Sequence, residues 1–483
     1  MPYPLATFGI LINSLAALAA GLVLAGLWDW WPFRPLRDGV LRPLAMAITV
    51  HWFIYFGPIN LCALWLKSDT QVMFAWVIRR SQISEASLYG FVAYVMVLSV
   101  LALIAWLLQR SDWARELRLI PRWPRAQVLA VTILLALMAL LVHSVFGMPV
   151  ANGGAWMAML PLPLQPFSKG LFLIEAIPLI ATGWQVLSAS GPPSWRQRWF
   201  FVLIAILQLV TFILLRQRFL ALMAVAWFAG CLLRWWRKPS LVLGVPLGMC
   251  LVYSIATALR FTRREQSYGE SRADYLQHTF GYFIEGLIPA NLGASALNDF
   301  SYNKAGAASL SVVLDLREQG LIRVHQPLAW LSAELYRALP GHIKPAFMSW
   351  GALNAEQLVS RALGVGEPGW SNPGVHAHLA LGWVVDMMET PLLDPVASAG
   401  WLGMLFFAGL APILLAILWC MSCRLVRWMP CLWLLPMGIL AVVALGTSWL
   451  GDILVFLKVV GPWLLLCLLV ATIHGWHLRE SPA

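Results

Sequence analysis

Five arginines, and no lysine, lie at the predicted outer ends of neighbouring apolar segments. Arg216 and Arg218 separate two short apolar segments, and Arg260, Arg263 and Arg264 follow the next one. A guanidinium binds phosphate oxygens in a bidentate manner and is more weakly hydrated than an ammonium. Arginine at the edge of a membrane is costly unless it is paired or hydrated. The pattern therefore favours binding of a lipid phosphate or pyrophosphate. The alternatives are snorkelling towards bulk headgroups and ion pairs with the acidic residues that follow Arg264.

A second group of chemically capable residues begins within a turn-rich stretch, residues 369–378. It comprises His376 and His378, then Asp386 and Glu389. Histidine accepts or donates a proton near neutral pH. The two histidines share a face only on extended backbone, whereas the two acids share a face on a helix. We consider a substrate-contacting or catalytic role for this group, with packing or capping as the alternative. The spacing matches no metal motif, and no metal is expected.

A turn bracketed by prolines, residues 339–345, carries His342 and Lys344 at its tip. A lysine in such a turn is a candidate contact for a phosphate or a sugar. The chain contains no phosphate-binding P-loop, no serine nucleophile elbow and no zinc-protease helix motif. The chemistry of these enzyme classes is therefore not indicated.

The composition defines the elements that must position these residues. The chain has 483 residues, of which 60% are hydrophobic and 11% are charged, against about 25% charged in soluble domains. This composition excludes a soluble enzyme, a disordered protein, a nucleic-acid-binding protein and a disulfide scaffold. We expect an all-α polytopic membrane protein, and we interpret the net charge of +11 as a signal of topology.

A transmembrane helix needs about 20 apolar residues, and about eleven segments qualify. They are 5–28, 43–66, 87–109, 127–149, 170–188, 199–215, 219–233, 240–259, 396–419, 431–449 and 457–475. Alternate short loops carry sixteen basic residues on one side and seven on the other. By the positive-inside rule, the N-terminus lies outside and the C-terminus lies in the cytoplasm.

The polar part of the chain is concentrated in one long periplasmic loop. We expect transmembrane helices 1–8 in residues 1–260, the loop in residues 261–395, and helices 9–11 with a cytoplasmic tail in residues 396–483. The loop holds 13 of the 22 acidic residues of the chain. It is also rich in aromatic residues, which predicts short helices at the membrane surface. These are expected near residues 282–284, 327–331 and 347–350.

The order of these features resembles the Wzy-type repeat-unit polymerases of bacterial surface polysaccharides, most nearly the enterobacterial-common-antigen type. The resemblance covers roughly residues 199–420 and rests on Arg218, on Arg260 followed by Phe261, and on the Pro-Gly-basic turn that contains Lys344. Arg216 stands where the family hairpin has glycine. The long arginine–glycine motif of some members is not found in the loop.

The resemblance implies a GT-C-like fold and glycosyl transfer at the periplasmic face of the bacterial inner membrane, without metal or cofactor. A growing glycan on undecaprenyl pyrophosphate would pass to a hydroxyl of the next lipid-linked repeat unit. The pyrophosphate would be held by basic residues, which are Arg216, Arg218, Arg260, Arg263, Arg264 and Lys344. The base would be His376 or His378, with Asp386 second. The implied partners are lipid-linked oligosaccharides, membrane lipid and a membrane protein that regulates chain length.

Two alternatives stay open. An O-antigen ligase has the same donor chemistry with a different acceptor. A flippase or transporter of lipid-linked saccharides would perform no chemistry, but such proteins usually consist of two related halves with short loops. The single long loop of this chain argues against that class.

Overall fold

The computed structural model describes the chain in separate stretches. They are residues 4–58, 60–61, 64, 80–111, 128–130, 132–134, 137, 194–214, 271–286, 288, 306–339, 390–428, 432, 434–446, 448–458, 461 and 465. All regular structure within these stretches is helical, and they contain no strand. The predicted all-helical class is confirmed for this part of the chain.

The chain forms two compact units, and each is described by itself. Unit 1 comprises Met1–Ile120, Leu297–Arg424 and Val442–Lys458. Unit 2 comprises Pro121–Ala296, Leu425–Ala441 and Val459–Ala483.

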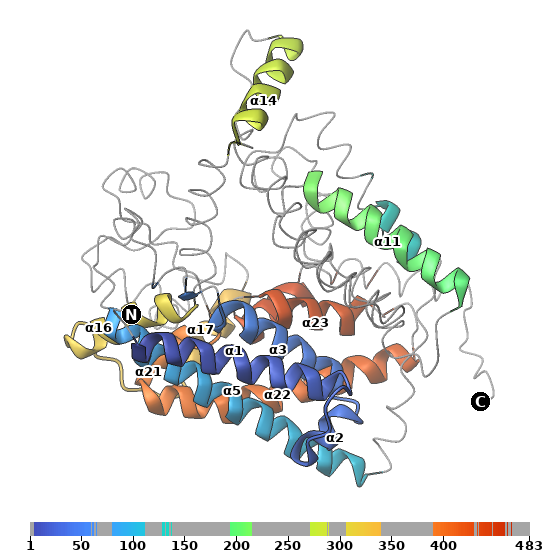
Figure 1. The fold of residues 1–483 in the computed structure, drawn as a ribbon. Helices are drawn as coiled ribbons and strands as arrows, with labels where there is room; N and C mark the ends of the chain where they lie inside the picture. Colours follow the sequence, from blue (N-terminus) through green and yellow to red (C-terminus); the bar gives the residue numbers. More distant parts are fainter. Residues whose placement is uncertain are drawn as a thin grey trace. The chain divides into compact units, whose positions relative to one another are not determined.

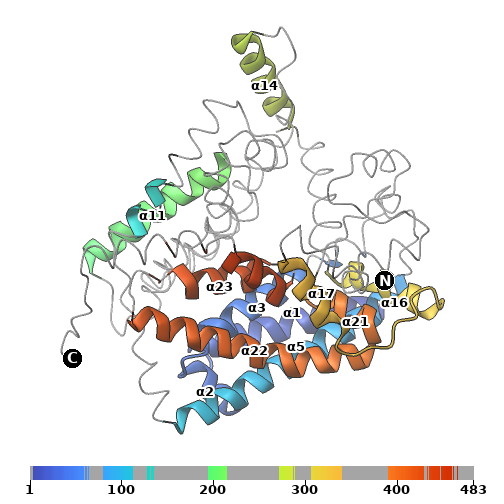
Figure 2. The same cartoon turned by 180° about the vertical axis from the view of Figure 1, so that it is seen from behind.

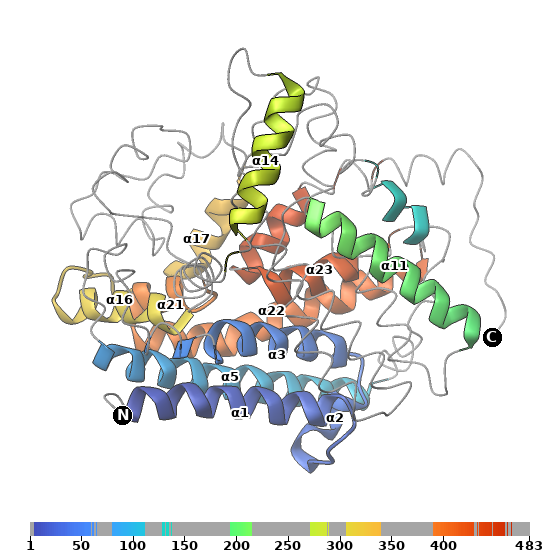
Figure 3. The ribbon, with the colours of Figure 1, turned by 45° about the horizontal axis from the view of Figure 1, so that its top comes forward.

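The long helices of unit 1 are α1 (Pro4–Leu24), α3 (Arg42–Phe56), α5 (Arg80–Gln109) and α22 (Trp401–Trp428), whose last residues belong to unit 2. Helices α1, α3 and α5 lie side by side (Figure 1; Figure 3). The helix α23 (Leu434–Leu445) begins in unit 2 and ends in unit 1. Helices α1, α3 and α5, with the part of α22 that belongs to unit 1, form the bundle on which the remaining elements of unit 1 pack.

Three described helices are long and apolar enough to cross a membrane. They are Pro4–Leu24, Gln82–Gln109 and Trp401–Val426. A pair of helices, Trp31–Arg37 and Arg42–Phe56, makes a fourth if its bend of 112° falls within one span. The structure therefore supports a membrane protein with helical spans. Five of the other predicted spans, 127–149, 170–188, 219–233, 240–259 and 457–475, lie largely or wholly outside the described residues.

Both faces of the helix α1 carry mainly apolar side chains, although Asn13 and Ser14 are also buried on its inner face. Ala6, Ile10 and Ala17 are buried in the bundle. The opposite face exposes large apolar side chains at helical spacing, namely Leu5, Phe8, Leu11, Leu15, Leu18 and Leu22. A helix that is apolar all round suits an apolar solvent such as lipid.

Close approach of small and aromatic residues holds the bundle together. A Cβ added at Gly90 would lie 2.6 Å from the Phe56 ring, so that only glycine lets α3 and α5 meet here. The Trp52 indole donates a hydrogen bond to the Gly90 carbonyl at 3.0 Å. Its ring stacks on Phe56 and on Tyr94, with centroids 5.2 and 5.4 Å apart. These contacts fix the register of α3 against α5.

The segment 261–395 contributes three helices to the described structure: α14 (Arg272–Gly286), α16 (Gly306–Glu318) and α17 (Ala329–Ala338). Helices therefore form at two of the three predicted sites, 282–284 and 327–331, whereas 347–350 lies outside the described residues. The sequence did not predict α16.

The helix α16 is buried from its first residue to Leu316. It packs against α5, α3 and α21 (Leu393–Ala399). Its first turns contain Gly306, Ala307 and Ala308, and these small residues permit close packing. Figure 2 shows α16 and α21 together at the end of unit 1 where α1 begins. Part of the predicted loop is thus core of unit 1.

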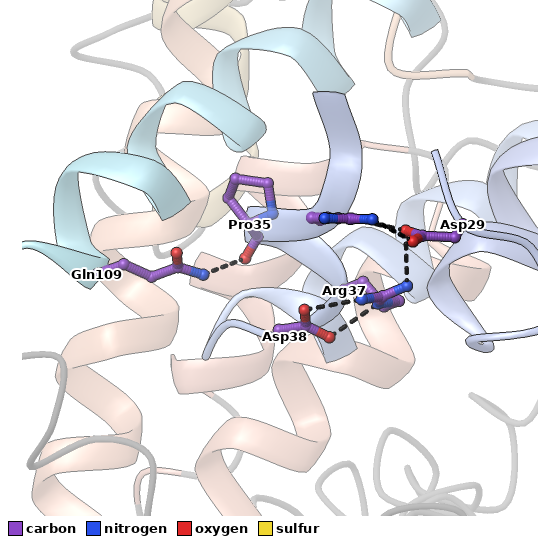
Figure 4. A network of polar contacts seen from close by, with 6 residues as sticks. Asp29, Pro35, Arg37, Asp38 and Gln109 are labelled. Carbon is purple, nitrogen blue, oxygen red and sulfur yellow. Dashed lines mark hydrogen bonds and ion pairs between the residues drawn. The ribbon is translucent and has the colours of Figure 1, made fainter. Parts of the chain in front are cut away.

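The opposite end of unit 1 carries a turn of ion pairs between α1 and α3 (Figure 4). It includes a 3-10 helix (Trp31–Phe33) and α2 (Arg34–Arg37). Arg34 pairs with Asp29, while Arg37 contacts Asp29 at 3.0 Å and Asp38 at 2.8 Å. The Gln109 amide donates to the Pro35 carbonyl at 3.0 Å, which ties the turn to the end of α5.

Unit 2 contains α14 and α11 (Trp195–Leu214), and α11 matches the predicted span 199–215. Ser271 begins α14, since its Oγ accepts the Asp274 N–H at 3.2 Å and donates to the Asp274 carboxylate at 2.6 Å. A serine hydroxyl that accepts a backbone N–H of the first turn is a common helix N-cap.

Candidate functional site

The residues predicted from the sequence to form the site lie outside the described residues. They are Arg216, Arg218, Arg260, Arg263, Arg264, Lys344, His376, His378 and Asp386. The structure neither brings them together nor separates them, and they stay predictions. Described elements do flank them in the chain. Helix α17 and its cap at Leu339 end five residues before Lys344, and the description resumes at Thr390, four residues after Asp386.

The described part of unit 1 contains a buried acid that the sequence analysis did not single out. Glu334, on α17, is only 2% exposed. Its Oε2 accepts hydrogen bonds from the Ser448 hydroxyl and from the Gly451 N–H. Ser448 precedes a helix of residues 449–458. The first N–H groups of a helix have no partner within it and favour an anion, which explains why a carboxylate is accommodated there.

A second acid completes this group, which we call the Glu334 cluster: Glu334, Ser448, Gly451 and Asp452. The Asp452 carboxylate accepts the Ser448 N–H at 2.9 Å. Ser448 is thus held between two carboxylates. A Cβ added at Gly451 would lie 2.5 Å from Glu334 Oε2. Only glycine at this position leaves room for the Glu334 carboxylate.

Rings of α3 pack on Trp449, the residue that follows Ser448 of the cluster. His51 packs on Tyr55 and on Trp449, with ring centroids 4.3 and 5.5 Å apart. Asp452 acts electrostatically on Tyr55, which places the cluster beside the end of α3. Trp330 lies one turn before Glu334 on α17 and is fully buried. The apolar surroundings strengthen the electrostatic interactions of the two carboxylates.

Hydrogen bonds also hold α21 against α16 and against the residues just before α17. Arg317 donates from Nη1 to the carbonyls of Val324, at 3.0 Å, and Ala397, at 2.6 Å. The Gln326 N–H donates to the Ser398 carbonyl at 3.1 Å. Burial lowers the pKa of Arg317, and an interaction with Tyr89 opposes this effect. These hydrogen bonds hold α21 in a fixed position against α16 and the residues just before α17.

A sequence signal exists for both acids. Glu334 is a single acid in an apolar stretch, 328–336, and Asp452 interrupts the apolar residues between 431 and 475. Lone acids in apolar segments of membrane proteins often serve a function. Within the stretches that the structure describes, no group of three or more His, Cys, Asp or Glu side chains is arranged to hold a metal ion.

Comparison with known proteins adds no relative. No protein-family model, no curated protein and no solved structure matches the chain. Any assignment of function therefore rests on the residues and on the described geometry.

Proposed function

We propose that this chain is a membrane glycosyltransferase that polymerises undecaprenyl-pyrophosphate-linked oligosaccharide repeat units. It works at the periplasmic face of a bacterial inner membrane. In this proposal the chain crosses the membrane about eleven times in a GT-C-like arrangement, with the N-terminus outside and the C-terminus in the cytoplasm. The observation that carries the proposal is the set of arginines at the predicted outer ends of spans six to eight, above all Arg218 and Arg260.

The proposed reaction depends more on neutralising the charge of the leaving pyrophosphate than on a general acid. A hydroxyl of the incoming repeat unit attacks the anomeric carbon of the growing glycan. The bond from that carbon to pyrophosphate breaks, and the lipid pyrophosphate leaves with the electron pair. Guanidinium groups that bind it stabilise the developing charge. The proton of the attacking hydroxyl passes to a base, for which His376 or His378 is the first candidate and Asp386 the second.

The described helices support this proposal in two ways. Apolar helices long enough to span a membrane agree with a substrate carried on a lipid. Helices from the predicted periplasmic segment, α16 and α17, fold onto the bundle and do not form a free loop. A substrate held between a lipid anchor and a folded extramembrane segment has its reacting groups restrained, which favours transfer.

The test is a gel of surface and lipid-linked polysaccharide from a deletion strain complemented with wild type, Arg218→Ala or Arg260→Ala. We expect both variants to lose the ladder of long chains and to leave a single repeat unit on the acceptor, at normal protein level. Arg196→Ala is the matched control, since it removes one arginine from a predicted cytoplasmic loop and should keep the ladder.

Two other results would change the assignment. Long lipid-linked chains that never reach the surface acceptor would indicate a ligase. An unchanged ladder in Arg260→Ala would contradict the role of the arginines.

A further inference from the structure

The turn between α1 and α3 exposes several indole rings. Leu27 and Trp31 are 78% and 77% exposed, and Trp28 and Trp30 are about half exposed. The Trp28 and Trp30 rings stack with centroids 6.4 Å apart, and the Trp30 ring contacts the Phe33 ring with centroids 5.1 Å apart. Large apolar side chains that gather on a surface mark a contact with a partner or with a membrane. This stretch is therefore a candidate interaction surface.

The turn is held in a fixed position against the bundle. Leu36 is fully buried. The Gln109 amide, at the end of α5, donates to the Pro35 carbonyl at 3.0 Å (Figure 4). The Trp419 indole of α22 donates to the Val40 carbonyl at 2.9 Å. The exposed rings are therefore presented at one level of the bundle, which is the level where α5 ends.

The short helical part of the turn lies across the direction of the bundle. The axes of Trp31–Arg37 and Arg42–Phe56 meet at a bend of 112°, which is close to a right angle. The second of these helices is α3, which lies beside the apolar helices α1 and α5 (Figure 1). When α1 and α5 cross a bilayer, the first helix therefore lies nearly parallel to the bilayer surface. Helices in this orientation lie at the boundary between headgroups and acyl chains.

Exposed apolar side chains also give way to exposed arginines at this level on α5 and α22. On α5 the Arg110 guanidinium lies 3.5 Å from the centre of the Trp106 ring, which is a cation–π contact. A bilayer has the same order from acyl chains to headgroups, with tryptophan favoured at the boundary. The exposed residues are Leu103, Trp106, Leu107 and Arg110 on α5, and Ile417, Met421 and Arg424 on α22.

Arginines outnumber acids among the described residues of this end. Arg34 pairs with Asp29 and Arg37 pairs with Asp38, which leaves the charges of the exposed Arg110 and Arg424 in excess. By the positive-inside rule, such an excess marks the cytoplasmic end of a span. Anionic lipids of the cytoplasmic leaflet attract basic residues. The charge of this end therefore suits anionic headgroups.

We propose that this end of unit 1 binds the headgroup region of a bilayer that contains anionic phospholipid. The indole rings lie at the boundary between headgroups and acyl chains, and the guanidinium groups bind lipid phosphates. The contact holds unit 1 at a fixed depth in the membrane, and it does not depend on the reaction proposed above. We call it the aromatic–arginine surface, and it comprises Trp30, Trp31, Trp106, Arg34, Arg110 and Arg424.

The first measurement is the depth of Trp31 in a bilayer. The full chain carries fluorinated tryptophan and is placed in nanodiscs of phosphatidylcholine and phosphatidylglycerol. Fluorine NMR lines are assigned by their loss in Trp31→Phe and in Trp330→Phe. We expect a nitroxide on the lipid headgroup to broaden the Trp31 line more than a nitroxide at the end of the acyl chain does. The Trp330 line is the internal control and should change little, because Trp330 is fully buried.

The second measurement is the affinity for anionic lipid, read from the Trp31 line as phosphatidylglycerol is added to the chain in detergent. We expect phosphatidylglycerol to bind more tightly than phosphatidylcholine. Arg34→Gln should weaken the binding of phosphatidylglycerol at least about fivefold, since one basic residue near a membrane surface contributes about this factor. Arg323→Gln is the matched control, because it removes another exposed arginine, one that donates to the Gly320 carbonyl, and it should leave the affinity unchanged.

Several results would overturn the proposal. A Trp31 line broadened by a water-soluble gadolinium chelate and by neither lipid label would leave the exposed rings as a surface for a protein partner. A line broadened most from the end of the acyl chain would place the turn in the hydrocarbon. Equal affinities of wild type and Arg34→Gln would contradict the binding of lipid phosphate. Wild-type protein that elongates no chains would contradict the proposed function alone, because neither measurement uses the reaction.

Discussion

Asn60 caps the helix α16 from a distant part of the chain: its Oδ1 accepts the N–H of Ala307 at 3.0 Å. The Asn60 Nδ2 donates to the carbonyls of Tyr55, at 2.9 Å, and Gly57, at 3.1 Å. One buried amide therefore supplies hydrogen-bond partners both to carbonyl groups at the end of α3 and to an N–H group at the start of α16. Because helix ends leave backbone groups unpaired, this amide joins the bundle to the segment predicted as a loop.

Asn60→Ala should destabilise the protein by about 2–3 kcal/mol, because it removes a helix cap and leaves buried carbonyl groups without a donor. Asn60→Asp keeps the acceptor for Ala307 and loses the amide donor, so an intermediate loss is expected. The measurement is the thermal unfolding midpoint of the purified protein in detergent. An unchanged midpoint in Asn60→Ala would contradict the proposed connection of α3 and α16 through Asn60.

Gly306→Ala should destabilise the protein by about 1–3 kcal/mol through overpacking. A Cβ at this position would lie 2.7 Å from the Tyr55 carbonyl oxygen and from Thr390 Cγ2. Gly409→Ala, inside α22, is the control, because a Cβ there meets nothing within 4 Å. That variant should be neutral or more stable, since alanine favours a helix over glycine. Equal unfolding midpoints for the two variants would show that α16 does not pack as described.

Arg317→Ala should lower the unfolding midpoint clearly more than Arg323→Ala. Arg317 supplies hydrogen bonds to Val324 and Ala397 and is partly buried, whereas the exposed Arg323 donates to the nearby Gly320 carbonyl. Loss of a buried charged donor costs about 1–3 kcal/mol. Hydrogen exchange should rise in residues 393–400 only in Arg317→Ala. The same exchange pattern in both variants would contradict the role of Arg317 in holding α21.

The ion pairs of Asp29 and Asp38 should make the stability of the protein depend weakly on pH. Hydrogen bonds from Arg34 hold the pKa of Asp29 below its ordinary value, and hydrogen bonds from Arg37 do the same for Asp38. A carboxyl whose pKa is lower in the folded state stabilises the fold above its unfolded pKa of about 4, and the contribution is lost as the pH falls through the folded pKa. The double variant Asp29→Asn and Asp38→Asn should therefore unfold slightly below wild type at neutral pH. The two midpoints should converge below about pH 4. If the difference between the two unfolding midpoints grew as the pH fell, the predicted direction of the effect would be wrong.

Elongation by the purified protein should persist in EDTA, because the proposed mechanism uses guanidinium groups in place of a metal ion to neutralise the leaving pyrophosphate. The measurement compares elongation rates before and after dialysis against the chelator. Rate loss that added magnesium or manganese restores would turn attention to Asp386, Glu389 and the two histidines as ligands.

Residue types and spacing can single out individual residues of a candidate site, but they do not identify the distant residues that these contact. The sequence draws attention to Asp452 as an acid among apolar residues, but it says nothing of the partner of this acid. Glu334 and Ser448 are 114 positions apart, and no local pattern links them. The arginines and histidines predicted from the sequence lie outside the described residues and stay predictions.

The sequence by itself determined the helical, membrane-protein character of the chain and the approximate location of helices such as α1, α5 and α22, although their ends differ from the predicted ones by up to nine residues. These features follow from local composition and from runs of apolar residues long enough to span a bilayer. Only the tertiary structure decided that α16 is buried and that Glu334 and Asp452 both bind Ser448. Contacts between residues far apart in the chain depend on how helices pack, and helix packing is set by close side-chain fit that no single segment encodes.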